Sequence, residues 1–339
     1  MPSSSPATLR HHILELELRH TFRLSRGASG SRRNVIVKLE HEGLVGLGEA
    51  APIARYGQSA ESSAVAVAQM AERLGDPRAF DSAARRAAVP GQEAAEAALD
   101  IALWDLAGKR LGAPIYELLG LDPALGPPTS FTIGLDTPEI VREKVREAGE
   151  YHVLKVKLGT DDDLEVLAAV RKVTDRPLRV DANEGWTLDG ALARLETLAD
   201  MGVELVEQPL PEGELDAMRE LKRRSPLPLF ADESVHRAED IPRLAGAFDG
   251  INIKLMKCGG IGEALRMIHV ARASGLQVML GCMIETSIAI TAAAHLLPLV
   301  DHADLDGHLL VRHDPFRGAA LRDGKLVLPA GPGLGVEER

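Results

Sequence analysis

The sequence is poor in cysteine and lacks a long apolar run. Its two cysteines, Cys258 and Cys282, have a spacing that fits neither a metal site nor a redox motif. No stretch of about 18 consecutive apolar residues occurs, which argues against a membrane span. The N-terminal segment carries charges and histidines where a signal peptide needs an apolar run. We therefore expect a cytoplasmic protein.

Basic and aromatic residues are also scarce. Lys and Arg number 39 against 50 Asp and Glu, which gives a formal net charge of -11. Negative charge of this size repels nucleic acids and anionic membranes, so we expect neither as a partner. Aromatic residues make up 3% of the chain, but apolar residues make up 45%, which is enough for a substantial core. The length allows one large domain or two ordinary ones.

The first part of the chain has the pattern of a small α+β domain, which we assign to residues 1–125. Residues 11–20 alternate apolar and polar side chains, as a half-buried strand does. Residues 33–52 predict two more strands, joined by a turn at Glu42-Gly43. Apolar positions recur at helical spacing in residues 91–114. Strands followed by helices are typical of the α+β class.

Short strands then alternate with helical patterns. We expect strands at 130–135, 152–158, 177–182, 203–208, 228–233, 250–256, 277–282 and 301–306. Eight such units predict a (β/α)8-type barrel over residues 126–315, although the eighth strand has poor strand propensity. An open doubly wound sheet is the alternative, but the glycine loop that usually follows its first strand is missing. Residues 316–339 are rich in Gly and Pro, and we expect them to fold back onto the first domain.

Acidic residues end three consecutive predicted strands. Asp181, Glu207 and Asp232 each follow an apolar run, and the C-terminal ends of barrel strands meet at one mouth. Three carboxylates placed together repel one another unless a cation binds them, and oxygen ligands suit Mg²⁺. A single acid at a strand end is more often a helix cap or a solvated loop residue. Three in succession predict a metal site.

Lysines lie on both sides of these acids. Lys155 and Lys157 share one face of the second barrel strand because strand side chains alternate, and Lys254 lies on the sixth strand. A Lys-x-Lys pair is usually a solvated strand face. The order Lys, Asp, Glu, Asp, Lys on successive strands instead indicates catalysis, in which two lysines exchange an α-proton next to a carboxylate with inversion.

The motifs KVKLG, RVDANEGW, VEQPL, ADES and NIKLMKCGG resemble those of the enolase superfamily, in particular its muconate-lactonizing subgroup. The resemblance implies an enolase-like modified barrel with a capping domain, and one Mg²⁺ per subunit. The metal ligands that it implies are Asp181, Glu207 and Asp232. It makes Lys157 and Lys254 the acid/base pair and Lys155 an electrostatic helper. Lys257 is a competitor for Lys254, but strand alternation and the family pattern favour Lys254.

The segment ADLDGHL, residues 303–309, resembles the dipeptide epimerases, in which an Asp-x-Asp pair binds the substrate's α-ammonium group. Asp304 and Asp306 would point the same way and favour a cation. The alternative is a structural turn. The implied reaction is Mg²⁺-dependent epimerisation of a dipeptide at the α-carbon of its C-terminal residue, through an enediolate. Barrels of this family are commonly dimers or octamers, so we expect a homo-oligomer.

Substrate specificity is less defined by the sequence. Arg26 sits where related epimerases that accept a C-terminal glutamate place an arginine, which makes L-Ala-D/L-Glu the lead substrate. Arg23, Arg32 and Arg33 lie in the same stretch and can equally be solvated. Further candidates for substrate contact are Asn183 and Met283.

Other functions of the same site stay open. The alternatives are a cycloisomerase, an o-succinylbenzoate synthase and an N-acylamino acid racemase. Their substrates have no ammonium group that Asp304 and Asp306 could bind. A catalytically inactive binding barrel is a further alternative. The intact lysine pair argues against it, because binding alone needs no paired bases.

Overall fold

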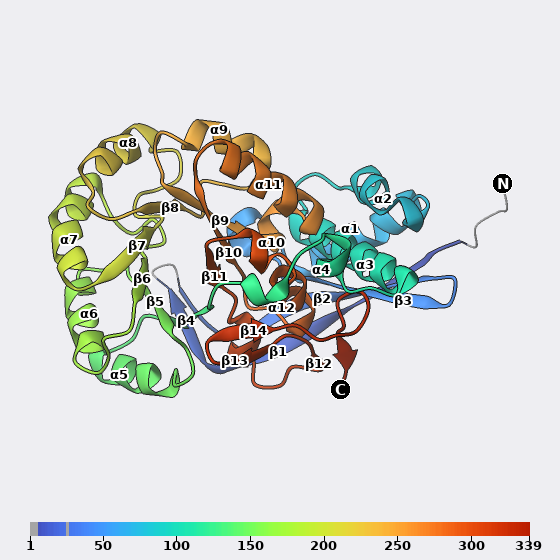
Figure 1. The fold of residues 1–339 in the computed structure, drawn as a ribbon, viewed down its shortest axis with the longest axis horizontal. Coiled ribbons are helices and arrows are strands. Elements are labelled where there is room, and N and C mark those ends of the chain that lie inside the picture. The colour runs from blue at the N-terminus through green and yellow to red at the C-terminus, as the bar shows by residue number, and fades with distance from the viewer. Residues whose placement is uncertain (1–5, 25–26) are drawn as a thin grey trace.

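A three-stranded antiparallel sheet with helices precedes a parallel barrel in the computed structural model (Figure 1). The structure describes residues 6–24 and 27–339, with side chains for 6–19 and 29–339. The first unit contains β1 (Thr8–Leu24), β2 (Gly27–His41), β3 (Leu44–Ala50), the short 3₁₀ helix η1 (Ala54–Tyr56), α1 (Ala60–Arg73), α2 (Phe80–Ala87), α3 (Glu93–Leu111) and α4 (Ile115–Leu118). These elements confirm the predicted strands and the long helix.

Small residues let α3 lie directly on this sheet. The strand order is β1-β2-β3, and the β2–β3 turn places Glu42 and Gly43 at positive φ. Gly48 of β3 faces α3 so closely that a Cβ atom there would lie 1.9 Å from the carbonyl oxygen of Ala98. The alanine-rich face of α3 is buried against the strands. The sheet and this helix therefore form one packed layer pair.

The barrel has the eight predicted strands, in sequential order. They are β4 (Ser130–Ile133), β5 (Val153–Lys157), β6 (Leu178–Asp181), β7 (Val203–Glu207), β8 (Leu229–Ala231), β9 (Gly250–Lys254), β10 (Gln277–Gly281) and β11 (His302–Asp304). A parallel bridge between Thr129 and Ala303 joins the first strand to the last. The expected fold class is confirmed. The eighth strand, whose sequence has poor strand propensity, is present with three residues.

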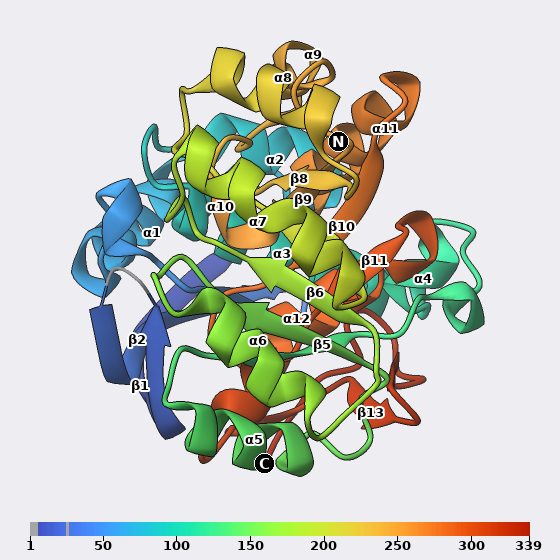
Figure 2. The ribbon, with the colours of Figure 1, turned by 90° about the vertical axis from the view of Figure 1, so that its left-hand side faces the viewer.

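Helices connect the strands and lie outside them. These are α5 (Pro138–Glu147), α6 (Asp163–Arg171), α7 (Leu188–Asp200), α8 (Leu215–Arg224), α9 (Ile241–Leu244), α10 (Leu255–Cys258), α11 (Ile261–Ala273) and α12 (Ser287–Ala294). Figure 2 shows α6 and α7 outside β5 and β6. Among the helices of the described residues, none combines the length and apolar character that crossing a bilayer requires.

The strand register places charged residues side by side. Lys157, Asp181 and Glu207 are Cα partners across β5, β6 and β7. On the other side of the barrel, Lys254 and Asp304 both align with Gly281 of β10. All of these residues end their strands, so the register alone brings them to one mouth.

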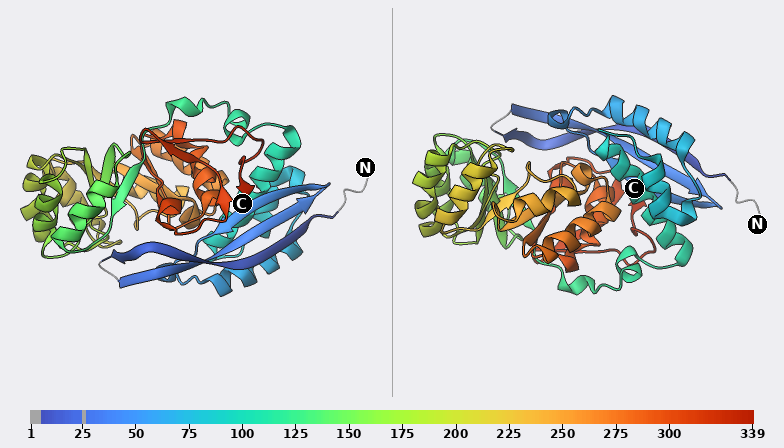
Figure 3. Two further views of the ribbon diagram at one scale, coloured as in Figure 1. Left: turned by 90° about the horizontal axis from the view of Figure 1, so that it is seen from below. Right: turned by 90° about the horizontal axis from the view of Figure 1, so that it is seen from above.

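The C-terminal segment packs against the first unit, as Figure 3 shows. It contains β12 (Phe316–Arg317), β13 (Ala320–Arg322), β14 (Lys325–Val327) and β15 (Glu337–Glu338). The backbone N–H of Leu334 donates to Asp105 Oδ1 of α3 at 2.8 Å, and Gly333 forms a bridge with Pro114. The segment also contacts the barrel, where the N–H of Thr129 donates to the carbonyl oxygen of Gly324 at 2.9 Å. The domain boundaries after residues 125 and 315 stay predictions.

Candidate active site

The C-terminal ends of the barrel strands open into a cavity of about 960 Å³. Its lining on the barrel side includes Lys155, Lys157, Asn183, Asp232, Glu233, Lys254, Met283, Asp304 and Asp306. The opposite wall comes from the first unit, through η1 and through Ser29, Arg32 and Arg33 of β2. Most of the residues predicted from the sequence therefore surround one space.

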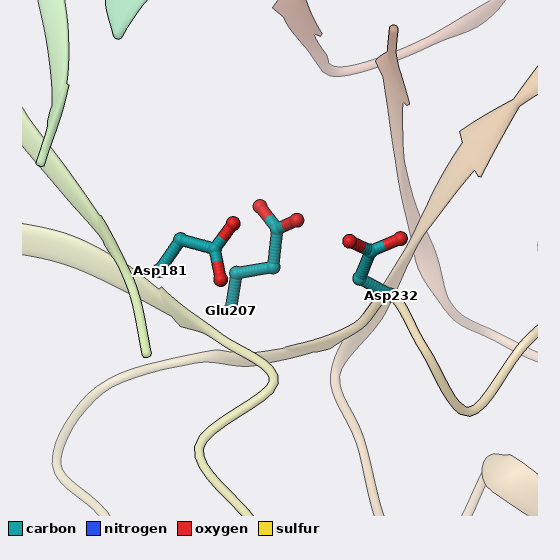
Figure 4. A group of neighbouring side chains, drawn as sticks. All are labelled: Asp181, Glu207 and Asp232. Atoms are coloured by element: carbon teal, nitrogen blue, oxygen red, sulfur yellow. The ribbon is translucent and has the colours of Figure 1, made fainter. Parts of the chain in front are cut away.

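The three predicted metal ligands lie together beside this cavity, and Asp232 lines it. One carboxylate oxygen from each of Asp181, Glu207 and Asp232 lies within 4.8 Å of the others, and all three side chains are buried. Figure 4 shows them side by side, on neighbouring strand ends. Carboxylate oxygens at this separation suit a hard divalent cation.

Burial and neighbouring charges give the three carboxylates different proton affinities. Burial raises the pKa of Glu207 to about 8, and the negative charge of Asp181 reinforces this. At Asp181 burial acts in the same direction, but Lys157 and Lys155 outweigh it and lower the pKa. At Asp232, Lys254 outweighs burial and also lowers the pKa. Glu207 therefore has the highest proton affinity of the three.

The buried charges at this mouth are unbalanced among the described residues. Seven carboxylates and five cationic groups are buried at this mouth or directly beneath it: Asp181, Glu207, Asp232, Glu233, Glu285, Asp304 and Asp306 against Lys155, Lys157, Arg179, Lys254 and Lys257. With every group ionised, two negative charges remain without compensation, which is costly in a buried site. One divalent cation supplies the missing charge, so the donor set fits Mg²⁺.

Lys157 and Lys254 face the acidic group from opposite sides. Lys157 Nζ donates to Asp181 Oδ2 at 2.6 Å, and Lys254 Nζ donates to Asp232 Oδ2 at 2.7 Å. Their strands, β5 and β9, are four apart in the eight-stranded order, which is half the barrel. Burial opposes the charge of Lys254, but Asp232 outweighs burial and raises its pKa. The two amines can therefore reach opposite faces of a molecule held between them.

Lys155 links the acidic group to the eighth strand. Its Nζ lies 2.7 Å from Glu207 Oε2, 2.8 Å from Asp304 Oδ2 and 3.2 Å from Asp181 Oδ2. Burial opposes its charge, but the surrounding carboxylates outweigh burial and raise its pKa. Lys155 is therefore a permanent cation that fixes these carboxylates.

Lys257 occupies a different position from Lys254. The strand β9 ends at Lys254, and Lys257 belongs to the following helix α10. Its Nζ contacts a carboxylate oxygen and the carbonyl of Asp232, and donates to the Val235 carbonyl at 3.1 Å. It holds Asp232 from outside the cavity, whereas Lys254 lines the cavity. This position favours Lys254 as the second base.

Asp304 and Asp306 both line the cavity but have different partners. Asp304 accepts hydrogen bonds from Ser130 Oγ at 2.6 Å and from Lys155 Nζ at 2.8 Å. Asp306 accepts one from the backbone N–H of Thr132 at 2.7 Å, and in the described part of the chain it has no ion pair. Burial and then the charge of Asp304 raise the pKa of Asp306 to about 6. A cationic ligand would relieve this repulsion, mainly at Asp306.

The remaining predicted residues have mixed outcomes. Asn183 adopts a positive φ of 43°, and its N–H donates to Asp181 Oδ1 at 2.9 Å, so it orients that carboxylate. Met283 lines the cavity. Arg26 lies outside the described residues.

The sequence did not assign a role to Asn252. Its Nδ2 donates a hydrogen bond to Glu207 Oε1 at 2.8 Å. Asn252 lies on the same strand face as Lys254, and this pattern could have indicated that it belongs to the site.

Known proteins resemble this chain over nearly its full length. The L-Ala-D/L-Glu epimerase of Bacteroides thetaiotaomicron is 46% identical over 95% of this chain and 85% of its own length. A dipeptide epimerase from Enterococcus faecalis, solved with Mg and the dipeptide L-Leu-L-Tyr, is 34% identical with a TM-score of 0.92, covering 97% of this chain and 99% of that one. An N-succinyl Arg/Lys racemase from Bacillus cereus is 29% identical with a TM-score of 0.93, covering 99% and 96%.

Two family models match the two structural units in turn. Residues 10–120 match the mandelate racemase / muconate lactonizing enzyme N-terminal domain. Residues 137–339, more than half of the chain, match the enolase C-terminal domain-like family. The acidic trio and both lysines fall within the second match. The chain therefore belongs to the mandelate racemase and muconate lactonizing enzyme family of the enolase superfamily.

Proposed function

We propose that this chain is a Mg²⁺-dependent dipeptide epimerase with L-Ala-D/L-Glu as its lead substrate. It inverts the α-carbon of the C-terminal residue. The observation that carries this proposal is the placement of Lys157 and Lys254 on opposite sides of one buried acidic trio. The identity of 46% to an L-Ala-D/L-Glu epimerase supports the substrate.

The two ends of the dipeptide bind to separate groups of carboxylates. Asp181, Glu207 and Asp232 would hold Mg²⁺ beside the cavity. When bound, Mg²⁺ supplies positive charge beside the substrate's C-terminal carboxylate and stabilises the negative charge that forms when the α-proton leaves. Asp306, assisted by Asp304, binds the free α-ammonium group. The dipeptide thus binds in one direction, with its second α-carbon between the lysines.

Proton transfer then requires one neutral and one charged lysine. The neutral amine, Lys157 or Lys254 depending on the epimer, takes the α-proton as the C–H bond breaks and becomes an ammonium. The electron pair moves into the carboxylate, which leaves a planar enediolate. The opposite lysine, already protonated, gives its proton to the other face of the α-carbon. One proton is taken and one is returned, so the product is the epimer.

The Asp304/Asp306 pair favours a dipeptide over the alternative substrates of this family. The racemase from Bacillus cereus has nearly the same fold, so the fold alone does not choose the substrate. A succinylated amine carries no positive charge at the position where these two carboxylates lie. Burying them against it would leave Asp306 uncompensated, because only Asp304 has a lysine partner. A cytoplasmic location and a homo-oligomeric assembly stay predictions from the sequence.

Exchange of the α-proton in D₂O tests the proposal directly. Purified protein with Mg²⁺ is given L-Ala-L-Glu, a panel of other L,L-dipeptides and N-succinylamino acids, and the α-protons are followed by NMR. We expect deuterium to enter the C-terminal residue while the alanine α-proton stays, and the L,D-epimer to accumulate. Exchange confined to N-succinylamino acids would instead identify an N-acylamino acid racemase.

A further inference from the structure

The cavity wall opposite the barrel carries an arginine without a carboxylate partner. The cationic residues that line the cavity, among those described, are Arg32, Arg33, Arg55, Lys155, Lys157 and Lys254. Each lysine pairs with a strand-end carboxylate. Arg33 pairs with Glu61, and Arg55 lies 2.7 Å from Glu184. Arg32 is therefore the exception to be explained.

Among the described residues, Arg32 makes one hydrogen bond, and its partner is the neighbouring residue. Its Nη1 donates to the carbonyl oxygen of Ser31 at 3.0 Å, and no carboxylate of the described residues forms an ion pair with it. Residues 1–5 and 20–28 contain no Asp or Glu that could do so. The side chain is half-buried, and burial lowers its pKa. Because a guanidinium stays protonated in proteins, burying it without an anion is unfavourable.

The position of Arg32 on β2 aims it at the mouth of the barrel. Side chains two apart on a strand share a face, so Arg32 lies on the same face as Asn34. Asn34 Nδ2 donates to the carbonyl oxygen of Ile284 at 3.1 Å, in the loop that follows β10. This face of β2 therefore faces the barrel mouth. Arg32 lies closer than Asn34 to the start of β2, where the chain turns back from β1.

The geometry of the proposed reaction sends the substrate side chain toward this wall. When the α-carbon loses its proton, its three other substituents lie in one plane, with Lys157 and Lys254 on either side. The carboxylate points to the acidic trio, and the amide nitrogen points toward Asp304 and Asp306. The remaining in-plane direction, taken by the side chain in both epimers, leads out of the barrel to the first unit.

We propose that Arg32 binds the side-chain carboxylate of an acidic C-terminal residue and so selects glutamate over its amide. The inference rests on the proposed function, and it gives Arg32 the role that the sequence suggested for Arg26. The planar guanidinium can donate two parallel hydrogen bonds to one carboxylate. Lysine lacks this geometry, so Arg32→Lys should recover only part of the preference.

The test compares L-Ala-L-Glu with L-Ala-L-Gln, which differ in charge but hardly in shape. For Arg32→Met we expect kcat/KM for L-Ala-L-Glu to fall about 10- to 100-fold, mainly through KM, as loss of a charge-assisted hydrogen bond predicts. The value for L-Ala-L-Gln should change by less than about 3-fold. Arg32→Glu should reverse the preference and favour L-Ala-L-Lys over L-Ala-L-Glu.

Arg10→Met is the matched control, because Arg10 lies on the same sheet, pairs with Glu40 and does not line the cavity. It should leave the Glu-to-Gln ratio of kcat/KM as in the wild type. An equal loss for both substrates in Arg32→Met would mean that Arg32 is only structural and would overturn the inference. A selective loss in Arg26→Met but not in Arg32→Met would also overturn it. If the wild type exchanged no dipeptide at all, the proposed function itself would fail, so the two failures are distinguishable.

Discussion

Lys157 and Lys254 lie half a barrel apart, yet each donates to a carboxylate of the same trio, Lys157 to Asp181 and Lys254 to Asp232. Each amine is therefore held by a different member of the trio, and both are directed at the space between them. A planar intermediate in that space presents one face to each lysine. The roles of the two lysines should consequently be separable by single substitutions.

Removing one lysine should stop inversion and leave exchange on one face. In Lys157→Met or Lys254→Met, we expect epimerisation to fall at least about 100-fold, because one proton-transfer group is lost. The remaining lysine can still take and return a proton on its own face. NMR in D₂O should show each variant exchanging the α-proton of only one epimer, and the two variants should prefer opposite epimers. Equal exchange of both epimers in either variant would contradict a two-base mechanism.

Binding of Mg²⁺ should release a proton from Glu207. The pKa of this carboxyl is raised to about 8 in the metal-free protein, so it is protonated at pH 7 and must lose its proton to become a ligand. Affinity for Mg²⁺ should therefore rise with pH up to about 8 and then level off. Calorimetry in buffers of different ionisation enthalpy should give roughly one proton released per ion at pH 7. Glu207→Gln should bind Mg²⁺ weakly and release none.

Asp306 should recognise the substrate's ammonium group. N-propionyl-L-glutamate has the shape of L-Ala-L-Glu without the amine, so the wild type should prefer the dipeptide. In Asp306→Asn we expect this preference to shrink about 10-fold or more, as loss of a charged hydrogen bond predicts. Steady-state kinetics with both compounds give the ratio. If Asp306→Asn weakened both substrates to the same extent, Asp306 would be a structural residue held by the Thr132 amide.

Stability should fall in mild acid because of buried His295. Its Nδ1 accepts from the Tyr116 N–H at 3.3 Å, and burial lowers its pKa to about 4. An unfolded histidine has a pKa of about 6.5 and takes up a proton more readily, so stability is complete above that value and is lost as the pH falls toward 4. Between pH 7 and pH 5 this amounts to about 2 kcal/mol.

Urea unfolding followed by circular dichroism at these two pH values measures the effect. His295→Gln keeps a polar side chain without the titration, so its stability should depend less on pH by about the same amount. His302 and His308 also have pKa values lowered to about 4 by burial, and they remain in both proteins, so they cancel in the comparison. An identical pH dependence in the two proteins would exclude His295 as a source.

Much of the fold and the acidic trio could be predicted because both depend on local pattern. Apolar runs ending in Asp181, Glu207 and Asp232 specify buried strands and the position of their last residue. The choice of Lys254 over Lys257 stays a prediction, and strand alternation does not bear on it, since β9 ends at Lys254 and Lys257 lies in α10.

Contacts between distant segments were not predictable in the same way. The backbone N–H of Thr132 binds Asp306 across 174 residues, and any residue except proline could supply that donor. The ion pair between Arg55 and Glu184 joins η1 to the loop after β6, and no sequence pattern in either segment predicts this contact. The significance of Arg32 likewise depends on which neighbouring cations already have partners, which only the structure shows.

The contact between Leu334 and Asp105 affects how the protein is made. Asp105 is a buried carboxyl in the first unit, and one of its hydrogen-bond donors is encoded 229 residues later, after the whole barrel. During synthesis on the ribosome, Asp105 Oδ1 lacks this donor until the barrel strands have emerged. The unit that carries Arg32 is therefore translated first, yet one of its buried carboxylate oxygens gains this donor only when nearly the last residues of the chain are available.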